Sequence, residues 1–478
     1  MNDTDHWVDR EVDVDAFPDA RLGKRCRAIL HAAQSHMGGT IPTASQDWAA
    51  TKGAYRFFDN PRIESSAILA GHFKATASRF ASASGPVFVL HDTTEFTYNR
   101  SSPEKVGKTN RINLGKDSNG RSREHTVCGL LLHASLVVTS QGVPLGLSAA
   151  KFWSRKEFHS DKAAGKAQAK QRPIEEKESY RWIENIQQST ALLADSGRIV
   201  HITDREGDMR ELFAAVMELG AHFLVRSYVE RKTGDGGDTI TELMAKTEAA
   251  GLHRIWTKGK DGKDREAELH VKYARTVLHP PGGGQKERSP IEVTVIRAHE
   301  ANPPAGQEGI EWTLLTDKLV DSFRDAVEKL EWYGRRWKVE TYFKNLKSGC
   351  RAEDSRLRTS DRLIGLLSVF CIVAWRMFWL SMMNRAEPEA PAESVFTDTE
   401  IKILKHCAPE AMKRKRKHTV SEGLNAVARL GGYLARKSDP PPGNLVLWRG
   451  FRRLIDIHLG YDLGINGRGP QPPPINYG

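Results

Sequence analysis

The sequence predicts an α/β protein in which a sheet-containing core carries a β-rich insertion and is flanked by helical segments at both ends. Two short apolar runs, PVFVLH at 86–91 and RIVHIT at 198–203, have the length and composition of buried strands. From about 222 to 316, β-branched and alternating runs are separated by Gly-rich turns. Residues 1–75 and 397–460 are helical in pattern.

These patterns divide the chain into three expected domains. Residues 1–75 would form a helical domain, 76–385 a core with its insertion at about 222–316, and 386–478 a helical C-terminal region with a disordered tail. Within the core, a long helix is expected from Asp321 to Lys347. Residues 385–394 (RAEPEAPAES) have the composition of a linker.

Length and charge indicate a globular protein with a polyanionic partner. The chain has 478 residues, more than one compact core usually holds, with 39% hydrophobic and 27% charged residues. Its formal net charge is +11, which favours nucleic acid or an anionic membrane surface as a partner. The alternative is a basic protein without such a partner. In the N-terminal domain, basic and aromatic residues interleave at 52–57, so either a small DNA-reading domain or an ordinary helical domain with a basic surface fits.

Cysteine usage and hydropathy predict a protein that works in the reducing interior of a cell. The five cysteines are far apart and form no CxxC pair, so neither a disulfide framework nor a zinc site is expected. The first fifteen residues are acidic and polar, and no signal peptide is expected there. The apolar stretch 364–383 is long enough to span a bilayer but contains Arg376, so a buried core helix is predicted and no membrane partner.

Two aspartates follow the two apolar runs directly. Asp92 comes after PVFVLH and Asp204 after RIVHIT. Two carboxylates held at the ends of neighbouring strands can share divalent metal ions, and Mg²⁺ prefers such hard oxygen ligands. A pair of metal ions can then act on a phosphodiester. The alternative is that each aspartate only begins a turn. Three other carboxylates compete for the same role: Glu95, Glu206 and Asp208.

A row of charged residues is expected along the 321–347 helix. Tyr333, Arg336, Glu340 and Lys347 are spaced by three, four and seven residues, and Lys344 falls on the same stripe. A carboxylate flanked by cations fits a metal site beside phosphates, with the cations offsetting the charge of a DNA backbone. The alternative is a solvated face with ion pairs four residues apart, such as Arg336–Glu340.

The same residues resemble a known family. The string Tyr333-x₂-Arg336-x₃-Glu340-x₆-Lys347 is similar to the Y-R-E-K signature of the IS-four-type DDE transposases, the family of the Tn-five transposase. The segments HDTT around Asp92 and TDREGD around Asp204 also resemble that family. So do GAYRFFDNP near the N-terminus and KRKRK followed by ARLGGYLARK near the C-terminus, so the resemblance covers nearly the whole chain.

The resemblance implies a fold and a role for each matching residue. The core would be RNase H-like, and Asp92, Asp204 and Glu340 would be the catalytic, metal-binding triad, holding Mg²⁺ with Mn²⁺ able to substitute. The residues implied to contact DNA are Tyr333, Arg336 and Lys347 on a backbone phosphate, Trp312 on a flipped-out base, and Arg25 and Arg56 on the terminal repeat; Lys344 joins them by its place on the stripe. For Trp312, a core position at a strand start is the alternative.

The activity implied is cut-and-paste DNA transposition. Water activated at the metal site would cleave the transposon end, and the freed 3′-hydroxyl would attack the opposite strand to form a hairpin. The hairpin would then be reopened, and the 3′-hydroxyl would finally join target DNA. The expected partners are double-stranded DNA with terminal inverted repeats, target DNA and a second copy of the chain in the synaptic complex. A bacterial cytoplasmic, nucleoid-associated protein is expected. Two alternatives are a DNA-binding relative that has lost catalysis and an RNase H-like nuclease.

One segment departs from the resemblance. Residues 99–123 (NRSSPEKVGKTNRINLGKDSNGRSR), which follow Asp92, form a long and basic stretch. Contacts to target or end DNA in this segment are therefore expected to differ from those of the relatives.

Overall fold

The computed structural model describes residues 7–35, 41, 48–116, 122–155, 172–234, 237–260, 262–280, 289–412, 417–436 and 438–466. They form two compact units. One consists of residues 1–75, 96–130 and 341–478, and the other of residues 76–95 and 131–340. We call the first the helical unit and the second the sheet unit. The predicted disordered end, 467–478, lies outside the described residues.

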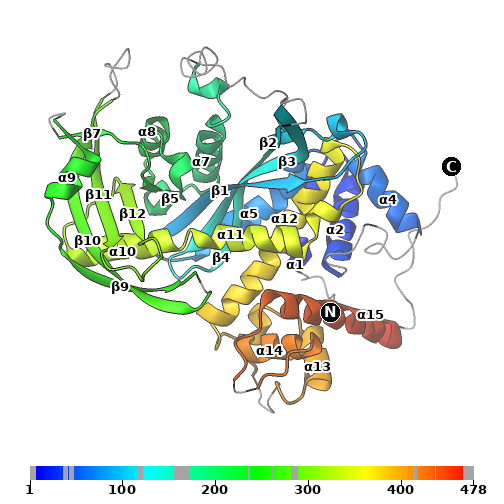
Figure 1. The fold of residues 1–478 in the computed structure, drawn as a ribbon. Coiled ribbons are helices and arrows are strands. Elements are labelled where there is room, and N and C mark those ends of the chain that lie inside the picture. The colour runs from blue at the N-terminus through cyan, green and yellow to red at the C-terminus, as the bar shows by residue number, and fades with distance from the viewer. Residues whose placement is uncertain are drawn as a thin grey trace. The chain divides into compact units, whose positions relative to one another are not determined.

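The sheet unit is built on a mixed sheet (Figure 1). Its strands run in the order β3-β1-β5-β6-β12-β11-β10, with β4 beside β3. Strands β1, β5 and β6 are parallel, whereas β12, β11 and β10 continue from β6 in antiparallel pairs. The bounds are β1 (Val87–Thr97), β3 (Ser122–Thr139), β4 (Pro144–Trp153), β5 (Ile199–Thr203), β6 (His222–Arg226), β10 (Asp264–Leu278), β11 (Ile291–Glu300) and β12 (Glu311–Thr316).

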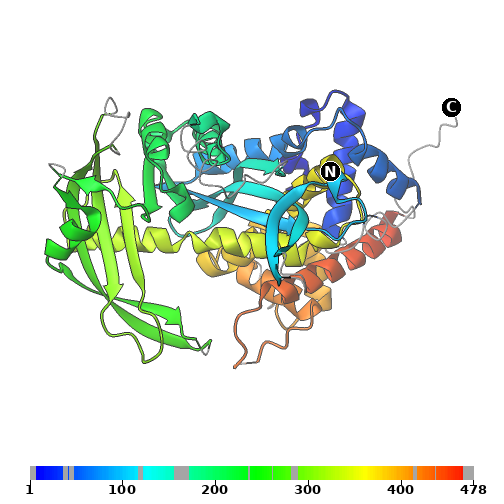
Figure 2. The same ribbon diagram turned by 45° about the horizontal axis from the view of Figure 1, so that its top comes forward.

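The region from 222 to 316 is rich in strands, as predicted. Long antiparallel strands, green in Figure 2, dominate it, with β9 (Gly251–Lys258) paired on the outside of β10. The short strands β7 (Lys232–Thr233) and β8 (Asp238–Thr239) extend the sheet beyond β10. One helix, α9 (Ile240–Lys246), was not predicted; it begins at a capping box in which Thr239 and Glu242 satisfy each other's backbone N–H groups.

Helices cover both faces of the central strands. Because side chains alternate along a strand, Val87 and Val89 of β1 face one side, where they pack in one apolar cluster with α7 (Tyr180–Leu193) and α8 (Arg210–Glu218). Phe88 faces the other side, where its ring lies 5.0 Å from that of Trp332 in α10 (Phe323–Gly334). Every second residue of β1 therefore points toward α7 and the others toward α10.

The single helix predicted from Asp321 to Lys347 is wrong in its continuity. The segment forms α10, a short break, α11 (Trp337–Lys344) and then a π-helical turn, η6 (Asn345–Gly349). At the break, the N–H groups of Arg335 and Arg336 donate to carbonyls only three residues earlier, which tightens the turn next to Gly334. Of the predicted stripe, Tyr333 and Arg336 are buried, whereas Glu340 is partly exposed.

The helical unit surrounds one long apolar helix, α12 (Ser360–Ala386). It packs against helices from both ends of the chain, including α2, α4, α14 and α15, and 83% of its most apolar stretch is buried. Arg376 is accommodated because it donates to the carbonyl of Val395 and lies over the ring of Trp379. The core-helix prediction is thus confirmed. The other helices are α1 (Trp7–Glu11), α2 (Ala20–Ser35), α4 (Trp48–Phe58), α5 (Ser65–Ser82), α13 (Asp398–Cys407), α14 (Val420–Leu430) and α15 (Asn444–Asn466).

The segment 385–394, predicted to be a linker from its composition, is folded. Helix α12 continues to Ala386, Pro391 forms a β-bridge with Thr419, and η8 (Ala392–Ser394) follows. Ala392 is fully buried, and its N–H donates to the carbonyl of His418. Local composition failed here because the order comes from contacts with residues more than twenty positions away.

Candidate active site

The pairing of β1 with β5 brings two aspartates to the same level. The parallel register runs from Val87 opposite Ile199 to Leu90 opposite Ile202, and the same offset places Asp92 level with Asp204. Asp204 follows the end of β5, as predicted. Asp92 does not end its strand, because β1 continues to Thr97. It does lie just beyond the last residue paired with β5, so the two carboxylates still meet at one edge of the parallel pair.

Strand alternation also sets the face of the sheet on which Asp92 lies. Asp92 shares the parity of Phe88 and therefore faces the α10 side, whereas Thr93 faces α7. The carboxylate orientations are fixed by local backbone groups. The N–H of Thr93 donates to Asp92 Oδ1 (2.7 Å), and the N–H of Glu206 donates to Asp204 Oδ1 (2.9 Å), where Asp204 caps the short helix η5 (Arg205–Gly207).

Glu340 joins this edge through Arg336. Arg336 Nη1 lies 3.2 Å from Asp92 Oδ2, and its Nη2 lies 2.6 Å from Glu340 Oε1. The predicted Arg336–Glu340 pair therefore exists, but the Arg336 side chain is only 8% exposed, so the pair is not on a solvated face. Burial raises the pKa of Asp92 to about 6; Arg336 opposes this rise, and the negative charges of Asp204 and Glu340 add to it. The charges of both other carboxylates therefore raise the pKa of Asp92.

The donor set of the three carboxylates fits a hard divalent cation. All the ligating atoms are carboxylate oxygens, which Mg²⁺ and Mn²⁺ prefer, and the mutual repulsion of the three charges is what a cation between them would offset. Among the described residues, however, no three such groups converge at metal-ligand distance. Arg336 explains why the three carboxylates do not converge, because its guanidinium bridges Asp92 and Glu340. The side chain of Glu340, 41% exposed, has room to rotate.

An aromatic and cationic group lies beside the carboxylates in the sheet unit. The ring of Trp312 on β12 meets that of Tyr333 edge-on, at 5.8 Å and 64°. Tyr333 is 2% exposed; burial raises the pKa of its hydroxyl, and the nearby guanidinium groups of Arg336 and Arg226 oppose the rise. Arg336 Nε is buried and has no hydrogen-bond acceptor within the described part of the chain. The group therefore offers positive charge and an unused donor toward an anion.

A residue that sequence reasoning missed, Arg181 on α7, links the neighbours of the two aspartates from the other face of the sheet. Its guanidinium donates to Thr93 Oγ1 (3.4 Å) and to Glu206 Oε2 (2.8 Å). These are the two residues whose backbone N–H groups hold Asp92 and Asp204. The Arg181 side chain is 11% exposed and lies over the rings of Trp153 and Trp182.

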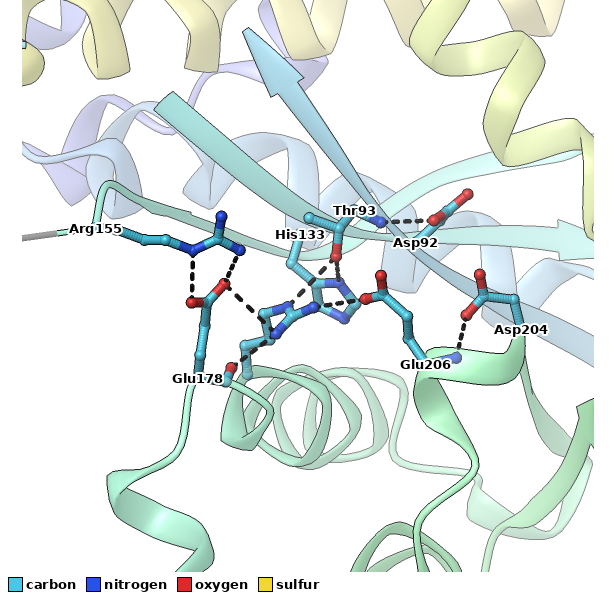
Figure 3. Close-up of polar contacts among 8 residues, drawn as sticks. Asp92, Thr93, His133, Arg155, Glu178, Asp204 and Glu206 are labelled. Carbon is cyan, nitrogen blue, oxygen red and sulfur yellow. Dashed lines mark hydrogen bonds and ion pairs between the residues drawn. The ribbon is translucent and has the colours of Figure 1, made fainter. Parts of the chain in front are cut away.

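Two further charges extend this network. Arg181 donates to the carbonyl of Glu178, and the Glu178 carboxylate forms a two-pronged pair with Arg155 at 2.8 Å (Figure 3). The EKESYR segment at 176–181 reads as an ordinary charged helix start. Nothing local in it distinguishes Arg181 from a solvated residue, because its partners come from 93 and 206.

Buried histidines form a hydrogen-bonded group next to the residues that hold the aspartates. His91 contacts His201 (2.9 Å) and Ser135 (2.9 Å), and His133 contacts Thr93 (2.9 Å). Burial lowers the pKa of His201 to about 3 and also lowers the pKa of His91 and of His133. These histidines are therefore neutral, hydrogen-bonded packing residues. His125, in contrast, is exposed on β3.

The competing carboxylates have other partners or positions. Asp208 is buried, pairs with Arg231 (2.7 Å) and accepts the N–H groups of Tyr228 and Val229, so it holds the loop after β6. Glu206 pairs with Arg181. Glu95 shares the parity of Thr93 and so lies on the opposite face of β1 from Asp92.

The remaining predicted DNA contacts belong to the helical unit. Lys344 is exposed on α11, and Lys347 lies over the ring of Phe96, 5.8 Å from its centre. Arg25 on α2 packs so closely over Gly53 of α4 that a side chain there would meet its guanidinium. Arg56 of α4 is exposed and helps to line an open cavity of about 530 Å³. The other lining residues are Trp48, Thr51, Lys52, Tyr55, Asp59 and Arg362.

Three protein-family models match the chain. Residues 4–63 match "Transposase DNA-binding", residues 182–375 match "Transposase DDE domain", and residues 372–461 match "Transposase Tn5 dimerisation domain". The second match contains Asp204, Trp312 and the whole signature from Tyr333 to Lys347.

The match to the DDE domain defines a DDE enzyme, which cleaves DNA, built on an RNase H-like core. The matches follow one another along the chain in the order DNA-binding, catalytic and dimerisation. The chain belongs to the DDE transposases similar to the Tn5 transposase. It is accordingly a DNA-binding protein that dimerises, and enzymes of its class use a divalent metal ion.

Proposed function

We propose that this transposase carries out cut-and-paste transposition with Asp92, Asp204 and Glu340 as its metal-binding triad. The supporting observation is the pairing of β1 with β5, which sets Asp92 level with Asp204, together with the coupling of Asp92 to Glu340 through Arg336. The three carboxylates would hold Mg²⁺, with Mn²⁺ as a substitute. When bound, the metal supplies an activated water and stabilises the charge that develops at the phosphate.

The residues around the triad would bind and orient the DNA end. Arg336 turns from Asp92 and Glu340 toward a backbone phosphate, which also gives its buried Nε an acceptor. Tyr333 supports this guanidinium from within the core. Trp312, partly exposed at the edge of β12, offers a face on which a flipped base can stack. Lys344 and Lys347 add positive charge along the DNA backbone.

The terminal inverted repeat would be read by the N-terminal helices. Arg56 and Arg25 lie on adjacent helices, and the exposed face of α4 also presents Trp48, which is 74% exposed, and Lys52, which lies over its ring. Exposed aromatic and basic groups on one helix suit contacts with DNA phosphates and bases. The active complex would be a homodimer on two transposon ends, with target DNA as the third component, in the cytoplasm of a bacterium.

Substitution Arg56→Gln is expected to weaken binding to the terminal repeat about tenfold, because one charged hydrogen bond to DNA is lost. The slope of log affinity against log salt should fall by about one. Fluorescence anisotropy with a labelled end fragment measures both quantities. Arg62→Gln, an exposed arginine just past α4, is the control. Equal losses in the two variants would contradict a specific role for Arg56.

Cleavage of a DNA fragment that carries the flanking terminal sequences tests the proposed function. With Mg²⁺ the parent protein should make defined cuts at the transposon end and join that end to a second DNA, and EDTA should stop both reactions. Binding without cutting in either Mg²⁺ or Mn²⁺ would indicate a relative that has lost catalysis. Cutting of branched DNA or of RNA–DNA hybrids, without strand joining, would indicate a nuclease.

A further inference from the structure

The long basic segment after Asp92 forms a two-stranded arm. Strand β2 (Lys108–Lys116) pairs antiparallel with the start of β3, from Asn110 opposite Val127 to Lys116 opposite Ser122. Figure 1 shows the two strands side by side. We call residues 108–116 and 122–126 the arm; residues 117–121 between them lie outside the described residues. In the described part of the chain, β2 has β3 as its partner and ends the sheet order.

Both faces of the arm are open. Every described side chain from Asn110 to Lys116 is exposed, and so are those of Arg123, His125 and Thr126 on the opposite strand. Because successive side chains of a strand point to opposite faces, neither face is covered. A two-stranded ribbon without a packed face is only marginally stable in water. The surface of the arm is therefore suited to a partner.

The base of the arm, in contrast, is fixed. Val106 is 1% exposed and Thr109 is fully buried. Gly129 of β3 lies so close to the carbonyl of Phe96 that no side chain would fit. The N–H of Tyr98 also donates to the carbonyl of Cys128 (2.9 Å). A fixed base with an open end is the arrangement of an element that reaches toward another molecule.

The charge of the arm fits a phosphate backbone. Residues 108–126 include five lysines or arginines and two acidic residues. Duplex DNA carries one negative charge for about every 1.7 Å of its length, and a two-stranded ribbon fits a DNA groove. Lys116 at the end of β2 and Arg123 near the start of β3 place cations on both strands.

Two apolar side chains complete the pattern. Ile112 and Leu114 are 47% and 57% exposed, and they lie two residues apart on one strand, so they share a face. Apolar side chains on an otherwise basic element are what minor-groove proteins insert between base steps to bend DNA. An element that binds DNA through cations and inserted apolar side chains depends little on the base sequence.

We propose that the arm binds target DNA, with its cations on the backbone and with Ile112 and Leu114 in the minor groove. The role presupposes the transposase function proposed above. Target rather than end DNA is the occupant because a target site has no fixed sequence, and the arm offers charge and an apolar wedge in place of a base-reading helix. The transposon end already has a reader in the matched DNA-binding segment, residues 4–63.

The test compares two arm variants with a control of equal charge. One arm variant carries Arg111→Gln, Lys116→Gln and Arg123→Gln, and a second carries Ile112→Ser with Leu114→Ser. The control carries Lys246→Gln, Arg254→Gln and Arg275→Gln, three exposed cations of the insertion. Four quantities are measured: cleavage of an end fragment, joining of pre-cut ends to a plasmid at 0.15 M salt, affinity for a random-sequence duplex that lacks the repeat, and the oligomeric state by light scattering.

Both arm variants should cut ends like the parent but join them to the plasmid at least tenfold more slowly. The charge variant should also bind the random duplex more weakly, with a smaller salt dependence, whereas the control should match the parent. Unchanged joining would overturn the proposal. Equal loss of end cleavage would assign the arm to the transposon end, and loss of the dimer in light scattering would assign it to a second copy. If even the parent fails to cut, the proposed function fails, while the random-duplex affinities still test the arm.

Discussion

Glu340→Ala is expected to abolish cleavage at the transposon end, by at least about a thousandfold, while leaving end binding intact. Removing one of the three proposed metal ligands should forfeit several kcal/mol of transition-state stabilisation, which corresponds to that factor. In this chain the substitution also releases Arg336 from one of its two carboxylate partners. Affinity for the end fragment should therefore stay the same or rise. Cleavage and binding are measured on the same labelled DNA, with Mg²⁺ and with Mn²⁺.

Glu331→Ala is the matched control, because it removes an exposed carboxylate on α10 only nine residues earlier. It should cut at the parent's rate. If Glu340→Ala cuts as fast as Glu331→Ala, then Glu340 is not a metal ligand. Asp92 and Asp204 would then need another third partner.

Arg181→Ala is expected to slow cleavage about a hundredfold although Arg181 lies on the opposite face of β1 from Asp92. Its guanidinium holds Thr93 and Glu206, and their backbone N–H groups orient the two aspartates. A displacement of about 1 Å in a catalytic constellation costs a factor of this size. The metal concentration that gives half-maximal rate should rise, because the separation of the two ligands changes. A purely structural role would lower the melting temperature without moving that concentration.

Two companion variants sharpen this measurement. Arg181→Lys keeps the charge but not the fork of donors, so it should restore only part of the rate. Arg155→Ala removes a neighbouring guanidinium from Glu178 and leaves the bonds of Arg181 to Thr93 and Glu206 in place. It should cut nearly as fast as the parent. A loss in Arg155→Ala as large as that in Arg181→Ala would show that the whole ion network, and not the positioning by Arg181, matters.

The sequence predicted the parts of the site that have a local signature. An apolar run followed by an aspartate is visible within six residues, and so Asp92 and Asp204 could both be predicted as candidates. The prediction that both end their strands was right for Asp204 and wrong for Asp92, because the run before Asp92 shows only the part of β1 that pairs with β5. The continuation of β1 pairs elsewhere and has no comparable apolar run.

Features set by long-range contacts were not predictable in the same way. Arg181 depends on partners 88 residues before it and 25 residues after it. The helix breaks between α10 and α11, yet the sequence there keeps the spacing of a continuous helix. The linker composition of 385–394 likewise concealed a folded segment, because its bridge partner, Thr419, is remote.

The position of α12 has a consequence for the order in which the protein becomes competent during synthesis. The N-terminal helices α2 and α4 pack against α12, and Phe58 next to Gly365 is one such contact. Residues 360–386 leave the ribosome only after Asp92, Asp204 and Glu340 have all been made. The helices of the matched DNA-binding segment therefore gain this support only after the three proposed catalytic residues have been made. A nascent or truncated chain lacking α12 would be a poor competitor for transposon ends, so the ability to bind DNA and the ability to cut it arise together.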